Sequence, residues 1–110
     1  MIYQRANYQC ELCGNTQGLQ KHHIVKRSQG GGDNQANIIL LCWHCHHGTK
    51  GVHGKQGHKL DLQLKAGLEK YYRKCYNERK VKELMGGKFY LWQVEVPEFV
   101  GSHFDKLKEE

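Results

Sequence analysis

Residues 10–45 read CELCGNTQGLQKHHIVKRSQGGGDNQANIILLCWHC and begin and end with a Cys-x-x-Cys pair. The pairs are Cys10/Cys13 and Cys42/Cys45, and 28 residues lie between them. Two residues between cysteines let both sulfurs reach one ion from a tight turn, and two such pairs complete a tetrahedral set of four thiolates, the closed geometry of structural zinc. Buried free thiols and a redox-active Cys-x-x-Cys are the alternatives. Two pairs in a chain with a small apolar core favour zinc.

The residues between the two cysteine pairs predict two short strands joined by a glycine loop. Residues 19–25 are strand-like and end on two β-branched residues. Residues 30–32 are a loop, because three consecutive glycines cost too much conformational entropy inside a helix or strand. Residues 37–41 predict a short buried strand, and residues 43–49 a helical turn or two. The expected order is therefore strand, glycine loop, strand and short helix.

The longest regular element that we expect is a helix over residues 59–80. Its apolar residues recur at helical spacing and form a narrow stripe, while basic residues fall on the opposite side. The stripe contains Leu60, Leu64, Leu68, Tyr71 and Cys75, and the basic face contains Lys70, Arg73, Lys74 and Lys80. Residues 88–96 alternate in polarity and predict a strand that stops at Pro97, and residues 102–108 predict a short final helix. We expect Cys75 to be a small core side chain.

The composition describes a small, basic chain with a limited core. Of 110 residues, 24 are Leu, Ile, Val or Phe, and the formal net charge is +6. Moderate basicity favours nucleic acid as the partner over an acidic substrate or a membrane. A membrane span is excluded because no run of about 18 apolar residues occurs. Residues 1–9 carry no apolar signal-peptide segment, so we expect a cytoplasmic protein, in which five cysteines are metal ligands or free thiols.

Charged and ligand-type residues are distributed unevenly along the chain. Residues 1–58 hold six basic and two acidic side chains, together with seven of the eight histidines and four of the five cysteines. Residues 59–82 hold eight basic and three acidic side chains, and residues 83–110 hold three and six. A ligand-rich, acid-poor module is thus followed by a basic helix and a mildly acidic tail.

Histidines and one asparagine occur at defined places between and after the cysteine pairs. His22 and His23 lie in the first predicted strand, Asn37 precedes the apolar second strand, and His46 directly follows the last cysteine. A four-cysteine frame, a His pair, an Asn and a final His in this order resemble the HNH endonuclease family over about residues 8–53. The resemblance implies a ββα-metal fold framed by a zinc site, with metal-dependent nuclease activity.

The resemblance also implies a role for each of these side chains. His23, the second of the pair, matches the general base, and Asn37 matches the residue that orients the base. His22 matches a metal-ligand position that is Asp in many members, and His46 matches the second metal ligand. The catalytic residues expected are thus His23, Asn37 and His46. Weaker candidates for the ligand role of His46 are His47 and His53.

The chemistry of phosphodiester hydrolysis agrees with these residue types. It needs a nucleophilic water, a proton acceptor and a cation that neutralises charge at the phosphate. An imidazole with a pKa near ~6.5 can accept a proton at neutral pH. Glu11 and Asp33 are the only acids in residues 1–58, too few for a carboxylate-rich two-metal site. We therefore expect one divalent ion held by imidazoles, with Mn²⁺ favoured and Co²⁺, Ni²⁺ or Mg²⁺ as alternatives.

The sequence thus predicts an α+β fold within one domain of residues 1–110. Residues 1–58 would form a small ββα-metal (HNH) module stabilised by a four-cysteine zinc site. Residues 59–110 would add the basic helix and a short C-terminal strand and helix.

The predicted function is that of a metal-dependent HNH endonuclease that hydrolyses DNA. A single His-Asn-His set cuts one strand per encounter, so we expect nicking of duplex DNA by a monomer, with a dimer as the alternative. The basic helix face either contacts phosphates without reading sequence or is only a solvated surface. Two other functions stay open, a non-catalytic zinc-knuckle DNA-binding protein and an interaction module that zinc merely folds.

Overall fold

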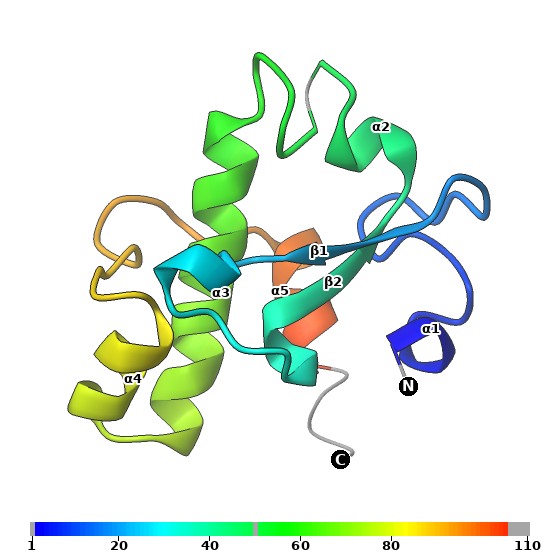
Figure 1. Cartoon of the computed structure of the whole chain (residues 1–110). Helices are drawn as coiled ribbons and strands as arrows, with labels where there is room; N and C mark the ends of the chain where they lie inside the picture. The colour runs from blue at the N-terminus through cyan, green and yellow to red at the C-terminus, as the bar shows by residue number, and fades with distance from the viewer. Residues whose placement is uncertain (1, 50, 106–110) are drawn as a thin grey trace.

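A computed structural model of the chain describes residues 2–49 and 51–105 (Figure 1). A short N-terminal helix precedes a two-stranded hairpin, and the longer helices follow the hairpin. The elements are α1 (Ile2–Arg5), β1 (Gln20–His23), β2 (Ile38–Leu41), α2 (Trp43–His46), α3 (His58–Cys75), α4 (Glu78–Leu84) and α5 (Glu98–Asp105), with 3₁₀ turns at Arg27–Gln29 and Gln35–Asn37. This is the α+β arrangement that the sequence predicts.

The hairpin pairs β1 with β2 in antiparallel register, from Gln20 opposite Leu41 to His23 opposite Ile38. The predicted order of strand, glycine loop, strand and short helix is confirmed, although each element is shorter than its predicted range. All four residues of β2 are buried. Successive side chains of a strand point to opposite faces, so Ile39 contributes to the larger core cluster and Leu40 to the smaller one beside α1.

Helix α3 packs its apolar face into the larger core cluster. Leu64, Leu68 and Tyr72 are buried, whereas Cys75 is exposed. The expectation of a core position for Cys75 is therefore wrong, because the last turn of α3 extends past the core. Gly67 lets α5 approach, since a Cβ there would lie 2.7 Å from the Phe104 ring. Neither α3 nor any other helix of the described residues is long and apolar enough to cross a membrane.

The single helix predicted over residues 59–80 is two helices in the structure. The chain turns to an extended conformation at Tyr76, where α3 ends. Asn77 then caps α4, because its side-chain oxygen accepts a hydrogen bond from the backbone N–H of Lys80 at 2.9 Å. An Asn at this position satisfies one of the unpaired N–H groups of a new helix. The apolar stripe ends at Cys75, next to this break, but basic residues continue to Lys80 and conceal it.

The strand predicted over residues 88–96 is not present, because this segment forms turns. The buried carboxylate of Glu69 accepts hydrogen bonds from the backbone N–H groups of Tyr90 and Leu91. A side chain of α3 thus takes the place of a neighbouring strand as the acceptor for these groups. The last helix also begins earlier than predicted, directly after Pro97, and residues 106–108 of its predicted range lie outside the described residues.

A buried ionic network joins both ends of the described chain to the hairpin. The carboxylate of Glu11 accepts hydrogen bonds from Arg5, from His103 Nδ1 at 2.9 Å and from the backbone N–H of Leu40 at 2.7 Å. Burial alone would raise the pKa of Glu11, but the His103 and Arg5 contacts and the Leu40 N–H outweigh it and lower this pKa to about 2. Glu11 is therefore ionised, and its hydrogen bonds connect α1, β2 and α5.

Candidate active site and zinc site

The four cysteines of the two Cys-x-x-Cys pairs converge on one point. The Sγ atoms of Cys10, Cys13, Cys42 and Cys45 all lie within 4.8 Å of one another, and none of the four is in a disulfide. The first pair is held in a tight turn in which Gly14 N–H donates to Cys10 O at 2.9 Å. The second pair begins at the residue that precedes α2. The quartet predicted from the sequence could therefore hold one metal ion, and four thiolates fit zinc.

The electrostatics of this quartet favour a bound cation. Burial, followed by the charge of the Cys10 sulfur, raises the pKa of the Cys45 thiol above its ordinary value. Cys13 and Cys42 lie only 3.5 Å apart between their Sγ atoms. Several thiolates cannot gather in one place without a compensating positive charge, and a divalent ion supplies that charge.

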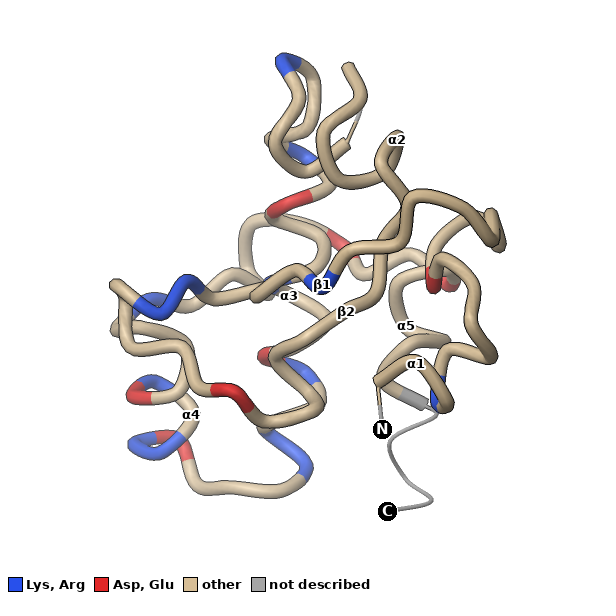
Figure 2. The backbone as a smooth tube through the Cα atoms, turned by 45° about the vertical axis from the view of Figure 1, so that its right-hand side comes forward, with Lys and Arg blue, Asp and Glu red and all other residues tan. Residues whose placement is uncertain are grey.

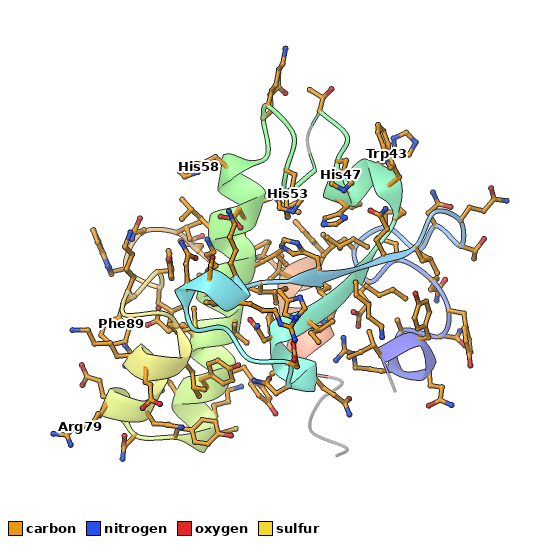
Figure 3. The ribbon with its side chains drawn as sticks, in the orientation of Figure 1. Trp43, His47, His53, His58, Arg79 and Phe89 are labelled. Atoms are coloured by element: carbon orange, nitrogen blue, oxygen red, sulfur yellow. The ribbon has the colours of Figure 1, made fainter. Side chains whose placement is uncertain are left out.

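A second ligand-type cluster contains only histidines. One ring nitrogen from each of His22, His46 and His53 lies within 4.8 Å of the other two. His22 comes from β1, His46 is the last residue of α2, and His53 belongs to the loop before α3. Figure 3 shows His53 above the hairpin beside His47, and shows His58 projecting away from the start of α3.

Two of these histidines are neutral and have a ring nitrogen free to bind an ion. Burial and the positive charges of the neighbouring histidines lower the pKa of His22 to about 3 and that of His46 to about 4. His22 Nε2 is buried and has no hydrogen-bond partner among the described residues. His46 Nδ1 lies 2.6 Å from the side-chain oxygen of Gln20, which can only accept, so the proton is on Nδ1 and the Nε2 lone pair is free. An unpartnered buried nitrogen beside two other imidazoles fits a metal site.

The third member of the cluster is His53, one of the two weaker candidates of the sequence analysis. The other, His47, has its ring 4.2 Å from that of His46 but lies outside the group of converging nitrogens. The loop that returns His53 to His46 depends on close backbone contacts. A Cβ at Gly54 would lie 1.8 Å from Gly48 O, and the backbone N–H of His53 donates to His46 O at 2.8 Å. The glycines that recur every three residues from Gly48 were the sequence signal for this tight loop.

His23, the expected general base, points away from the three-histidine cluster. Its Nε2 lies 2.8 Å from Asp33 Oδ1, and its side chain is 29% exposed. Adjacent strand residues leave the backbone in different directions, so the His22 and His23 side chains have different neighbours. Both nevertheless line one open depression on the surface. The residues that line this depression are Lys21, His22, His23, Lys26, Arg27, Ser28, His46 and His53.

Asn37 fixes the loop beside His23 through backbone contacts. Its Oδ1 accepts from the Val25 N–H at 2.8 Å, and its Nδ2 donates to Val25 O at 3.0 Å and to Gly32 O at 2.7 Å. The side chain thus joins both ends of the glycine loop. Asn37 influences the surroundings of His23 through this loop, and its side-chain bonds go to the backbone rather than to the imidazole.

The basic residues expected to bind DNA are on α3 and α4, outside the lining of the depression. Lys70 and Lys74 are exposed and line a separate pocket between α3 and α5. Arg73 is occupied by intramolecular contacts, with Nε 2.9 Å from Glu69 Oε2 and the guanidinium 4.8 Å from the centre of the Phe89 ring. Lys80 is exposed and lies 3.6 Å from Glu83. Figure 2 shows Lys and Arg positions both on α4 and on β1 with the segment after it.

The four-cysteine cluster leads to a prediction about metal content and stability. We expect one zinc ion per chain to be lost, with a large loss of thermal stability, in the variant Cys42→Ser, because zinc is worth on the order of 10 kcal/mol to small zinc-folded domains. Elemental analysis and thermal unfolding followed by circular dichroism measure both effects. The matched control is Cys75→Ser, an exposed cysteine outside the cluster, which should keep zinc and melting temperature. Full zinc content and stability in Cys42→Ser would contradict a structural zinc site.

Comparison with known proteins agrees with this geometry. A family model described as HNH endonuclease matches residues 10–50, the segment that carries both cysteine pairs, the hairpin and two of the three clustered histidines. No curated protein and no solved structure matches the chain. This match, and the four-cysteine cluster that frames the matched segment, make residues 10–50 similar to the HNH endonuclease family.

Proposed function

We propose that this protein is a metal-dependent endonuclease that hydrolyses DNA phosphodiester bonds and nicks one strand of a duplex. The observation that carries the proposal is the depression in which His23 and three converging imidazoles lie beside Lys21, Lys26 and Arg27. Such a surface offers a proton acceptor, a site for a cation and positive charge for a phosphate backbone. The family match supports nuclease chemistry in the same residues.

His23 is the general base of this reaction. It takes a proton from the attacking water, whose oxygen forms a bond to phosphorus while the bond from phosphorus to the 3′ oxygen breaks, which leaves a 5′ phosphate. His22, His46 and His53 would hold the divalent ion, which supplies positive charge at the phosphate and at the leaving oxygen when it is bound. Asn37 holds the loop next to the base through Val25 and Gly32.

The role of His23 is tested on supercoiled plasmid with Mn²⁺. Wild-type protein should give nicked circles before any linear product, and His23→Ala should be slower by ~10²- to 10⁴-fold because the general base is lost. The matched control is His58→Ala, since His58 is exposed, does not line the depression and projects away from the start of α3 (Figure 3). Zinc content and melting temperature should be equal in all three proteins.

Three outcomes of this assay would contradict the proposal. Absence of wild-type cleavage with Mn²⁺, Co²⁺, Ni²⁺ and Mg²⁺ would favour the alternative function, a non-catalytic zinc-knuckle DNA-binding protein. Linear product without a nicked intermediate would indicate a paired enzyme rather than a monomer that cuts one strand. Retained cleavage in His23→Ala would remove His23 from the mechanism.

The all-imidazole ligand set leads to a prediction about the metal. Imidazole nitrogen binds borderline transition metals better than Mg²⁺, which prefers oxygen. We expect Mn²⁺, Co²⁺ or Ni²⁺ to support faster cleavage than Mg²⁺ at equal free concentration, and His22→Asp to shift this preference towards Mg²⁺. His44→Asp is the matched control, because His44 is exposed and outside the cluster. Equal or faster cleavage with Mg²⁺ in the wild type would contradict the proposal.

DNA contacts outside the depression are proposed for Lys70, Lys74 and Lys80. Exposed lysines can neutralise phosphates without reading sequence, and this would position the duplex. Arg73 was predicted with them, but its bond to Glu69 and its contact with Phe89 give it a role in holding the residue 88–96 segment on α3. We keep Arg73 among the proposed DNA-binding residues. It would bind through the part of its guanidinium that Glu69 and Phe89 leave exposed.

We further propose that the chain acts as one domain and as a monomer. The larger core cluster contains residues from both predicted parts, such as Ile39 of β2 and Leu68 of α3. The Glu11 network likewise joins the first cysteine turn to α5. Shared burial of this kind supports one folding unit rather than a nuclease module with an independent extension.

A further inference from the structure

A chain of three polar side chains runs along the edge of the depression from His23 to Asp33 and Arg27. We propose that Asp33 is a positioning residue that holds the His23 ring through Nε2, so that Nδ1 is the nitrogen that accepts the proton from water. This inference rests on the proposed nuclease function and adds a residue to it. In the sequence, Asp33 is distinguished only as one of the two acids of residues 1–58.

The geometry gives each oxygen of Asp33 a separate partner. Oδ1 lies 2.8 Å from His23 Nε2, and Oδ2 accepts from the Arg27 guanidinium at 2.6 Å. The Arg27 bond fixes the plane of the carboxylate, and the carboxylate then restricts rotation of the imidazole. A base whose far nitrogen is held by an acid presents its near nitrogen in one orientation.

The loop that carries Asp33 is fixed in place by its backbone. Gly31 packs so closely on the segment after β1 that a Cβ there would lie 1.8 Å from Val25 O. The Asn37 side chain holds the next residue, Gly32, because its Nδ2 donates a hydrogen bond to Gly32 O at 2.7 Å. Asp33 therefore follows directly after two anchored glycines, and its contact with His23 spans ten residues of chain across a closed loop.

The protonation state of the pair follows from its partners. Hydrogen bonds from His23 and then from Arg27 lower the pKa of Asp33 below its ordinary value, so this carboxylate is ionised at neutral pH. An ionised carboxylate only accepts hydrogen bonds. In the neutral imidazole of His23 the proton is therefore on Nε2, which points at the carboxylate, and Nδ1 is the nitrogen with the free lone pair.

The alternative role for Asp33 is that of an ordinary surface acid, and it predicts the opposite result. Its side chain is 60% exposed and lies beside Lys26 and Arg27 at a surface proposed to bind phosphates. Removal of a negative charge there should tighten DNA binding and speed cleavage if the charge does nothing else. A positioning role requires slower cleavage even though binding is as tight or tighter.

The test compares steady-state cleavage of plasmid DNA in Mn²⁺ by wild type, Asp33→Asn and Asp33→Glu. We expect Asp33→Asn to lower kcat by ~10- to 100-fold, as loss of a supporting partner of a functional His does, with KM unchanged or lower. Asp33→Glu keeps the carboxylate and should recover part of kcat. Asp61→Asn is the matched control, because Asp61 is a surface acid of α3 that pairs with Lys65 at 2.9 Å and does not line the depression.

A double variant separates positioning from a structural effect. If Asp33 acts through His23, Asp33→Asn should cost nothing further in a His23→Ala background, because groups that act as a unit are not additive. An equal additional loss in that background would overturn the inference, as would an Asp33→Asn variant that cleaves as fast as wild type. Absence of wild-type cleavage would instead overturn the proposed function and this inference together.

Discussion

The convergence of four cysteine sulfurs is the constraint on which the rest of the structure depends. One Cys-x-x-Cys pair precedes β1 and the other follows β2, so an ion shared by them closes the segment that contains the hairpin. The second pair also begins α2, whose last residue is His46. Because a chain of this size has few large apolar residues, we expect metal binding and folding to be coupled. A metal ion held by the sulfurs would then also help to position the histidine cluster through α2.

The donor atoms of the two clusters suit them to different roles. The sulfur cluster is suited to holding the fold, and the imidazole cluster to chemistry at a metal ion. Four thiolates leave no open position on zinc, so the sulfur site stabilises the fold. Three imidazoles around an ion would leave positions for water or a phosphate oxygen, and the low pKa values of His22 and His46 keep these two side chains neutral and able to bind. The Glu11 network then ties the first cysteine turn to Leu40 of β2 and His103 of α5. Residues outside the matched segment, such as His103, therefore stabilise it through buried hydrogen bonds.

The sequence predicted the elements whose signals are local. Cysteine spacing, the glycine run and the apolar residues 37–41 indicate the hairpin and the four-cysteine cluster, and the order of these signals indicated the resemblance to the HNH endonuclease family that the match over residues 10–50 bears out. Prediction from the sequence failed where a long-range contact determines the local structure. Residues 88–96 alternate like a strand, but the buried Glu69 carboxylate binds their backbone N–H groups. His53 joins the cluster through a tight loop that only its regularly spaced glycines signal. Asp33 reaches His23 across another loop, and this contact has no periodic signal in the sequence.

The most direct test of the account is anomalous diffraction from crystals grown with Mn²⁺, recorded at the zinc and manganese edges. The account predicts two separate ions, zinc among the sulfurs of Cys10, Cys13, Cys42 and Cys45, and manganese bound by nitrogens of His22, His46 and His53. A single sulfur-bound ion, with these three imidazoles turned apart and no metal between them, would contradict the nuclease proposal and leave a zinc-folded binding module.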